Sequence, residues 1–505
     1  MSRPLTRIVI VGGGTAGWMT AAGLSHFLRG QGQRPNAPRI TLVESDEIGT
    51  IGVGEASIPT LTGFNRLLGI DERDFMDRTQ GTFKLAIEFV DWTRKGYRFF
   101  HPFGAFGQPL DICDFHHHWL RAHAAGSGSD LDDYCLNTVL ARQDRFGGPN
   151  PAPNTPLSTV GHAYHFDAGL YARYLRAYAE DRGVTRVEGR ITRVDQHPET
   201  GFVTGVHLQN GTVVEGDLFV DCSGFRGLLI GETMKSDLID WIGLLPCNRA
   251  VAVPSARTEP VTPYTRATAR EAGWQWRIPL RHRTGNGYVY SSEHLSDDEA
   301  TTVLMANLDG EPLSDPRIVR FTTGRRQKAW VKNVVAIGLA AGFLEPLEST
   351  AIHLTQKGVL KLAKCLPDID FAPELIDEFN VQTAFDYEDV RDFLCLHYKS
   401  TEREDTPFWA YNKNNTVSDS LRHRMNLFRQ SGRIFVTEQE LFKMGSWLSV
   451  MWHQGLRPRG YDPVADALPQ AELEHSLAFL RDTFARTAAQ QPMHAAFLAA
   501  NFKDG

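Results

Sequence analysis

The chain has 505 residues, 42% of them hydrophobic and 22% charged, a globular composition that excludes disordered, collagen-like and coiled-coil classes. Its 53 basic and 60 acidic side chains give a net charge of −7, so the composition indicates no basic surface for nucleic acid or an anionic membrane. Because the length exceeds the usual size of a single hydrophobic core, we expect more than one substructure.

Cysteine and histidine usage gives no indication of a metal centre. The six cysteines are scattered without a CxxC pair, which predicts reduced thiols and neither a disulfide framework nor a zinc site. Three consecutive histidines at 116–118 do not point at one centre on a helix or a strand, so we interpret them as structural. We therefore expect no bound metal.

The sequence also gives no indication of a membrane segment. No apolar run approaches the roughly 20 residues that cross a bilayer. Arg3 and Arg7 precede an apolar stretch and superficially resemble a signal peptide, but glycines interrupt the stretch where it should be continuous. We expect a cytoplasmic protein with no membrane or nucleic-acid partner.

The N-terminal segment has the order strand, glycine turn, helix, strand and acid. Residues 8–11 (IVIV) predict a buried parallel strand, and residues 12–17 (GGGTAG) contain a GxGxxG pattern. Glycines there let backbone N–H groups approach a pyrophosphate at a helix N-terminus, and an acid after the second strand (40–43) suits ribose hydroxyls. A glycine-rich turn without a ligand is the alternative. The predicted dinucleotide-binding residues are Gly12, Gly14, Thr15, Ala16, Gly17 and Glu44.

Residues 83–89 (FKLAIEF) alternate apolar and other residues with period two. This spacing predicts a half-buried strand with Lys84, Ala86 and Glu88 on the less apolar face. On the pattern alone, Lys84 is a solvated strand lysine.

Two later segments, 218–226 and 334–342, each combine an apolar strand with a turn of small residues. The chain therefore returns to a dinucleotide-type sheet after long inserted segments. This layout suits FAD bound in an extended form, whereas a nicotinamide domain is more often contiguous. There is no second GxGxxG for NAD(P)H. We expect FAD, with Gly338 in the last of these turns among the residues that bind it.

Four motifs together resemble those of the flavin-dependent halogenases, the family typified by the tryptophan halogenases. They are the glycine turn at 12–17, residues 52–59 (GVGEASIP), the WxWxIP sequence at 274–279 and residues 343–350 (FLEPLEST). They occur in the family order and span most of the chain. WxWxIP together with a matching lysine is far more specific than any glycine motif.

The resemblance implies an α/β fold with a Rossmann-like FAD-binding domain of the flavin monooxygenase type and a mostly helical substrate-binding region. We expect a discontinuous FAD-binding and halogenation domain over residues 1–360, with substrate-facing segments inserted at about 60–160 and 235–330. We expect residues 361–505 to form a mostly helical C-terminal substrate region.

The resemblance also implies two catalytic residues. Lys84 stands in the family's Thr-Phe-Lys context and would receive hypohalous acid, either as a hydrogen-bond donor or as the amine of a haloamine. Glu348 would stabilise the cationic ring, accept its proton or position the hypohalous acid. Its alternative role is that of a carboxylate at the start of a helix. The backbone N–H groups around Thr350 and Ala351 would bind halide.

Aromatic residues account for the remaining predicted site. His101 and Phe103 resemble the pair that sandwiches the substrate ring, with ordinary aromatic core as the alternative. Trp274 and Trp276 would keep the substrate away from the flavin. Further residues are Gly54, Glu55, Ala56 and Leu347 for the cofactor, Ile278 and Pro279 in the separating motif, and Trp447 for the substrate.

The expected enzyme takes reduced FAD from a separate flavin reductase and, with O2 and chloride or bromide, forms hypohalous acid. Lys84 relays it to an electron-rich aromatic substrate, either tryptophan or an indole-like arene, for electrophilic substitution. The paired tyrosines and acid that hold the amino acid in tryptophan halogenases are not found here, and a carrier-bound substrate stays open. The alternatives are an FAD-dependent aromatic monooxygenase and a flavin-binding protein without catalysis. Homodimers are common in this family, but the sequence displays no interface.

Overall fold

The computed structural model describes residues 3–29, 37–47, 54–110, 112–149 and 151–503. Contacts divide the chain into two compact units, one made of residues 1–80, 166–243 and 320–388, and the other of residues 81–165, 244–319 and 389–505. Each unit is therefore assembled from three separate stretches, and the domain boundaries expected from the sequence stay a prediction. Within the described ranges, no helix is both long and apolar enough to cross a membrane.

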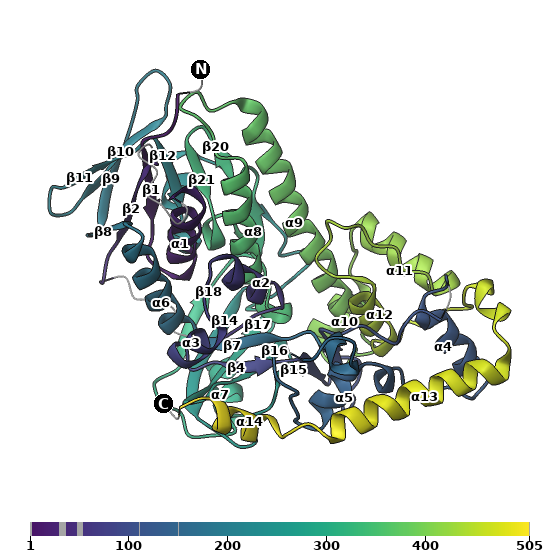
Figure 1. The fold of residues 1–505 in the computed structure, drawn as a ribbon. Helices are drawn as coiled ribbons and strands as arrows, with labels where there is room; N and C mark the ends of the chain where they lie inside the picture. Colours follow the sequence, from purple (N-terminus) through teal and green to yellow (C-terminus); the bar gives the residue numbers. More distant parts are fainter. Residues whose placement is uncertain (1–2, 30–36, 48–53, 111, 150, 504–505) are drawn as a thin grey trace. The chain divides into compact units, whose positions relative to one another are not determined.

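A six-stranded sheet forms the centre of the first unit, in the order β20-β21-β12-β1-β2-β8 (Figure 1). Five of its strands are parallel, and only the edge strand β20 is antiparallel. The four segments predicted as dinucleotide-type strands are adjacent in this sheet, which confirms the predicted α/β fold. The strands are β1 (Arg7–Val11), β2 (Arg39–Glu44), β8 (Thr185–Glu188), β12 (Leu218–Asp221), β20 (Trp330–Val331) and β21 (Val334–Ala336).

Helix α1 (Thr15–Arg29) packs between α6 (Ala168–Asp181) and α8 (Ala351–Lys364) (Figure 1). Gly23 permits the close approach to α8, because a Cβ at this position would lie 2.5 Å from a methyl group of Val359. The other elements of this unit are β3 (Gly54–Ala56), α2 (Thr60–Leu67), α3 (Glu72–Arg78), β9 (Ile191–Gln196), β10 (Val203–Leu208), β11 (Val213–Glu215), η3 (Gly224–Arg226), η4 (Leu228–Thr233), β13 (Leu238–Asp240), β19 (Gly324–Arg326), η5 (Gly338–Ala340), β22 (Gly342–Phe343), η6 (Pro346–Glu348) and most of α9 (Pro373–Lys399).

A seven-stranded mixed sheet forms the centre of the second unit, in the order β18-β14-β17-β16-β15-β5-β6. Strands β15 and β5 are parallel, and the pairs on either side of them are antiparallel. The strands are β5 (Ala86–Val90), β6 (Arg98–Pro102), β14 (Arg249–Ala256), β15 (Tyr264–Arg270), β16 (Gly273–Pro279), β17 (Arg283–Tyr290) and β18 (Arg317–Arg320).

The predicted half-buried strand at residues 83–89 is wrong in two respects. Two short strands replace it: β4 (Thr82–Lys84) pairs with β7 (Ala163–Asp167), whereas β5 joins the large sheet. Both of its faces are buried, with Lys84 fully inaccessible and Glu88 only 5% exposed. The alternation of apolar and polar residues shows which side chains share a face of the strand, but it does not show whether another layer covers the polar face. The interpretation of Lys84 as a solvent-exposed lysine is therefore wrong.

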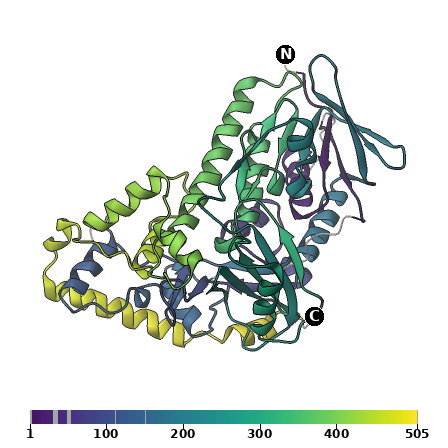
Figure 2. The same ribbon diagram turned by 180° about the vertical axis from the view of Figure 1, so that it is seen from behind.

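The C-terminal region is mostly helical, as predicted, and ends in the long helix α13 followed by the short α14 (Figure 2). The helices of the second unit are α4 (Phe115–Ala124), η1 (Leu131–Tyr134), α5 (Leu136–Arg142), η2 (Pro156–Thr159), α7 (Asp297–Ala306), α10 (Pro407–Asn414), α11 (Asp419–Ser431), α12 (Met444–His453), η7 (Pro463–Ala467), α13 (Gln470–Ala489) and α14 (His494–Asn501).

The cysteines and the three consecutive histidines, which were considered as disulfide or metal residues, are buried and contact other parts of the protein. All six cysteines are free and buried. His116 bonds to the carbonyl oxygen of Gly432 at 2.8 Å, and His117 accepts the backbone N–H of Asp462 at 3.2 Å, in agreement with a structural role for this run.

One group elsewhere has the spacing of metal ligands, namely Asp130, Asp132 and His453. Its negative charge is met by Arg142, whose guanidinium lies 2.7 Å from the Asp132 carboxylate. The imidazole of His453 bonds to Asp132 at 3.0 Å and to the hydroxyl of Tyr97 at 3.0 Å. An ion-pair network therefore accounts for this cluster.

Candidate active site

The glycine turn after β1 combines close backbone contact with open space. Gly12 has φ +110°, and a Cβ there would lie 2.3 Å from the carbonyl oxygen of Cys222, so only glycine fits. At Gly14, by contrast, a Cβ would meet no atom of the described residues within 4 Å. The first turn of α1 carries no acidic side chain. This open, positively polarised helix terminus fits the pyrophosphate of a dinucleotide.

The turn after β21 reaches the same helix terminus. Gly338 has φ +70°, and a Cβ at this position would lie 2.6 Å from the Cβ of Ala16. Two of the predicted cofactor residues, more than 300 positions apart in the sequence, therefore lie against each other. The inserted segments do not disturb this closure because both turns leave the carboxyl ends of parallel strands in one sheet.

Glu44 lies at the end of β2 beside the glycine turn. Its carboxylate accepts a hydrogen bond from the Arg186 guanidinium at 2.5 Å, and a Cβ at Gly13 would lie 1.4 Å from its other oxygen. The ion pair fixes the orientation of the carboxylate, while its role toward a ribose stays a prediction. Sequence reasoning missed Arg186, which no local motif marks.

The loop motif at residues 52–59 is only partly described, because Gly52 and Val53 lie outside the described residues. The next three residues, Gly54, Glu55 and Ala56, form β3. Burial raises the pKa of Glu55 to about 7.

The segment before α8 has an unusual backbone. Leu347 and Glu348 are buried in a short 3-10 turn, and Ser349 follows with φ +59°. The helix begins at Ala351 and not at Glu348, so the alternative role of Glu348 as a first-turn carboxylate is wrong. The left-handed Ser349 ends the 3-10 turn and separates Glu348 from the helix.

The residue that precedes α8 fits a small anion. Thr350 adopts a right-handed conformation directly after the left-handed Ser349, an alternation that turns successive N–H groups toward one concave point. Its hydroxyl is fully buried and meets no hydrogen-bond partner among the described residues. Buried polar groups rarely stay unsatisfied, so this position fits the predicted halide site at Thr350 and Ala351.

In the second unit, Lys84 ends β4 with its side chain fully buried. Its ammonium nitrogen lies 5.1 Å from the centroid of the Phe103 ring. The adjoining Leu85 fixes both residues: its N–H donates to the carbonyl oxygen of Pro263 at 2.7 Å, and its own carbonyl accepts the N–H of Phe103 at 3.0 Å. The predicted catalytic lysine and one predicted substrate aromatic are therefore brought together.

Hydrogen bonds connect the Lys84 strand to the WxWxIP strand. The hydroxyl of Thr82 donates to the carbonyl oxygen of Pro279 at 2.7 Å and bonds to Nδ1 of His165 at 2.8 Å. Because its single proton goes to Pro279, this hydroxyl accepts from Nδ1–H, which leaves Nε2 to accept from Thr265 at 2.9 Å. Burial and the charge of Lys84 hold the pKa of His165 well below its ordinary value, in agreement with this neutral imidazole.

Two further residues that the sequence did not reveal support the same strand. Nε2 of His494 accepts the N–H of Phe83 at 3.2 Å, while its Nδ1 bonds to the carbonyl oxygen of Val261 at 2.8 Å. Asn137 donates to the carbonyl oxygen of Leu85 at 2.9 Å. The backbone on both sides of Lys84 is thus held by side chains from helices α14 and α5.

The two tryptophans of WxWxIP lie on one face of β16. Trp274 is 1% and Trp276 8% exposed, and their ring centroids are 6.1 Å apart at an angle of 56°. Trp276 stands opposite Gly287 of β17, where a Cβ would lie 2.1 Å from its ring. The buried indole N–H of Trp276 has no hydrogen-bond partner within the described part of the chain. Ile278, two positions on, is 6% exposed.

His101 and Trp447, the other two aromatic residues predicted for the substrate, belong to one aromatic cluster. The ring of His101 lies 5.5 Å from Phe393, which in turn lies 4.9 Å from Trp447. Trp447 is 1% exposed, and its indole N–H donates to the carbonyl oxygen of Phe442 at 3.1 Å. His101 is thus grouped with Trp447, while Phe103 is grouped with Lys84.

The predicted residues divide between the units by role. The first unit holds the cofactor residues together with Glu348, Thr350 and Ala351. The second holds Lys84, the substrate aromatics and the WxWxIP motif.

Comparison with known proteins identifies the family to which this chain belongs. The family model described as tryptophan halogenase matches residues 7–470. Tryptophan 6-halogenase ThaL from Streptomyces albogriseolus is 35% identical over 519 residues, which cover 95% of this chain and 95% of the relative. The chain belongs to the tryptophan halogenase family of flavin-dependent halogenases.

Solved structures agree with this assignment. Xcc4156, a flavin-dependent halogenase from Xanthomonas campestris, superimposes with a TM-score of 0.95 at 48% identity, covering 100% of this chain and 99% of that one. BrvH, a flavin-dependent halogenase from Brevundimonas sp. BAL3, gives a TM-score of 0.94 at 47% identity and 99% coverage of both chains. The predicted family and fold are confirmed, as are reduced FAD, halide and O2 as the reactants that enzymes of this family use.

Proposed function

We propose that this enzyme halogenates an electron-rich aromatic substrate, either an indole-like arene or tryptophan, with Lys84 as the residue that receives hypohalous acid. A separate flavin reductase supplies the reduced cofactor. When bound, reduced FAD together with O2 and halide supplies the hypohalous acid. The transfer of hypohalous acid to the substrate and the removal of the ring proton are then carried out by residues of this chain.

The observation that carries the proposal is the environment of Lys84. An ammonium group is rarely fully buried. Here it lies beside the ring of Phe103, and the hydrogen bonds of Leu85 fix the backbone next to Lys84. The strand is also bonded to the WxWxIP motif through Thr82. Such support for a buried lysine is typical of a group that must be positioned for chemistry.

Two roles are proposed for the Lys84 nitrogen. As an ammonium it donates a hydrogen bond that orients hypohalous acid and polarises its oxygen–halogen bond. As a neutral amine it takes the halogen and becomes a haloamine, with water released. Either form places an electrophilic halogen beside the ring of Phe103, where a stacked arene would present its carbon.

Electrophilic substitution makes the substrate ring cationic, so a carboxylate is needed for the proton that leaves it. We assign this role to Glu348, which is fully buried in the segment that also supplies Thr350 and Ala351 for halide. Trp274 and Trp276 exclude the arene from the flavin, so that only hypohalous acid reaches it.

The proposal is tested by mass spectrometry of products formed by the purified enzyme with FAD, a generic flavin reductase and NADH. Indole and tryptophan are offered separately, each in chloride and in bromide. The expected product carries one halogen and shows its isotope doublet. A product heavier by one oxygen whatever the halide would instead identify an aromatic monooxygenase, and halide-independent flavin oxidation without product from either arene would contradict the proposed substrate class.

A further inference from the structure

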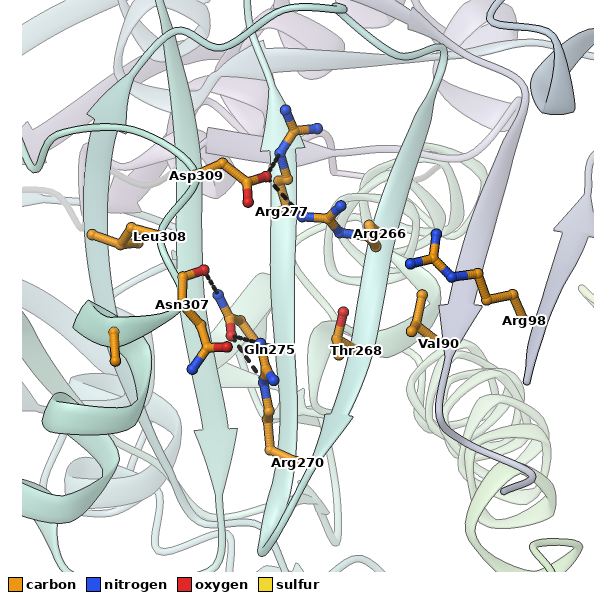
Figure 3. A pocket seen from close by; sticks show the side chains of 11 residues that line it. Val90, Arg98, Arg266, Thr268, Arg270, Gln275, Arg277, Asn307, Leu308 and Asp309 are labelled. Atoms are coloured by element: carbon orange, nitrogen blue, oxygen red, sulfur yellow. Dashed lines mark hydrogen bonds and ion pairs between the residues drawn. The ribbon is translucent and has the colours of Figure 1, made fainter. Parts of the chain in front are cut away.

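A pocket of about 340 Å³ lies on the face of the seven-stranded sheet opposite to Trp274 and Trp276. Side chains alternate along a strand, so the tryptophans of β16 occupy one face while Gln275 and Arg277 occupy the other. Figure 3 shows that four arginines converge on this pocket from three strands: Arg98 from β6, Arg266 and Arg270 from β15, and Arg277 from β16.

The close approach of these arginines is expected to lower the stability of the fold, because their positive charges repel one another. Arg266 and Arg277 stand directly opposite each other on neighbouring strands, where like charges repel. One carboxylate, that of Asp309, serves both guanidinium groups, at 2.8 Å and 2.7 Å. Burial lowers the pKa of Arg277, and the charge of Arg266 acts in the same direction.

The two remaining arginines add to the positive charge. Arg270 donates two hydrogen bonds to the amide oxygen of Gln275, at 3.0 Å and 2.7 Å, and this neutral partner does not neutralise the charge of the guanidinium. Arg98 extends toward Arg266 across the pocket and pairs with Glu88 at 3.2 Å (Figure 3). Asp91 influences Arg270 from farther away, while its own carboxylate accepts the N–H of Gly96.

Within the described residues, four guanidinium groups therefore have two carboxylates at ion-pair distance, those of Asp309 and Glu88. Asp91 acts on Arg270 and Asp144 acts on Arg277 from beyond ion-pair distance. Among the groups in direct contact, two positive charges therefore remain in excess, which matches a dianion. Guanidinium groups also bind phosphate oxygens in a bidentate manner, which favours phosphate over halide. The pocket is larger than a phosphate group, and its lining is mainly polar with Val90, Ala306 and Leu308 at its border, which leaves room for a small polar organic part.

We propose that this pocket is a binding site for a phosphate monoester, held by Arg266, Arg270 and Arg98 on the face of the sheet away from the WxWxIP tryptophans. In an organic phosphate ester and in free inorganic phosphate alike, the phosphate group would carry the negative charge that the arginines bind. An organic ester and free inorganic phosphate differ only in the contacts made by the organic part. The site is independent of the halogenation chemistry, so its test measures binding and not activity.

The test is calorimetric titration of the FAD-saturated protein at low ionic strength with glycerol 2-phosphate, inorganic phosphate and uncharged glycerol. Both phosphates are expected to give saturable binding and glycerol none, and tighter binding of the ester would assign the organic part. Arg266→Gln and Arg270→Gln should each weaken binding by about tenfold or more, because each removes a charge-assisted contact.

Two further variants control for folding. Arg317→Gln removes an exposed arginine of β18, at the opposite edge of the same sheet, and should bind as the parent does. Thr268→Glu adds a carboxylate inside the pocket without removing an ion pair, and should abolish binding. Absence of saturable binding in the parent, or equal affinity in the parent, Arg270→Gln and Thr268→Glu, would overturn the proposal.

Discussion

The contact between Trp276 and Gly287 gives a prediction whose size follows from the structure. In Gly287→Ala the new Cβ would lie 2.1 Å from the Trp276 ring, short of an ordinary carbon–carbon contact of about 3.5 Å by roughly 1.4 Å. Gly287 does not have a positive φ, so the alanine itself adds no backbone strain. The buried ring must therefore move by more than an ångström.

Overpacking of this kind destabilises a core by about 1–3 kcal/mol, and we expect the free energy of unfolding of Gly287→Ala to fall by that amount. Because Trp276 is assigned to the separation of flavin and substrate, less halogenated product should form for each reduced flavin oxidised. Urea unfolding gives the first quantity, and product analysis with flavin absorbance gives the second.

A double-mutant cycle identifies the cause. Trp276→Phe removes the two ring atoms that would lie 2.1 Å from the new methyl group, so adding Gly287→Ala to it should cost much less than in the parent. Gly460→Ala is the matched control, since a Cβ there meets no described atom within 4 Å, and it should change stability by no more than about 0.5 kcal/mol. Equal cost of Gly287→Ala with and without the indole ring would refute the steric reasoning.

Two other predictions concern the support of the Lys84 strand. Thr82→Val leaves the carbonyl oxygen of Pro279 and the imidazole of His165 without their shared hydroxyl, and should lower the free energy of unfolding by about 1–3 kcal/mol in urea titrations. Burial lowers the pKa of His494 to about 4, so its neutral imidazole stabilises the fold above pH 6.5, and this contribution is lost as the pH falls toward 4. Stability should drop by up to about 3 kcal/mol over that range, and His494→Gln should flatten the slope. An unchanged slope in His494→Gln, or a fully stable Thr82→Val, would contradict these assignments.

Local patterns were sufficient for the nucleotide-binding half of the fold. Each of four segments, 8–11, 40–43, 218–221 and 334–337, is a short apolar run, and such runs predict buried parallel strands without knowledge of their neighbours. Glycine or small residues follow three of these runs, and Glu44 follows the run at 40–43. The glycine turn could also be predicted from the sequence, because the positive φ that Gly12 adopts is a property of the local backbone.

The surroundings of Lys84 could not be predicted in the same way. Strand alternation cannot show that both faces of residues 83–89 are covered, since the covering residues come from distant parts of the chain. His165 and His494, which contact Thr82 and Phe83, lie 83 and 411 positions away from them. Only the resemblance to a family indicated that Lys84 is catalytic, and it did not identify the residues, such as His165 and His494, that hold the Lys84 strand in place.

The most direct test of the account compares the parent enzyme with Lys84→Ala in one reaction, following halogenated product by mass spectrometry and oxidation of reduced FAD by absorbance. The account predicts that the variant oxidises the flavin at the parent rate, because the cofactor residues lie in the first unit, and forms no halogenated arene. A Lys84→Ala enzyme that halogenates its substrate as fast as the parent would contradict the central claim that Lys84 receives the hypohalous acid.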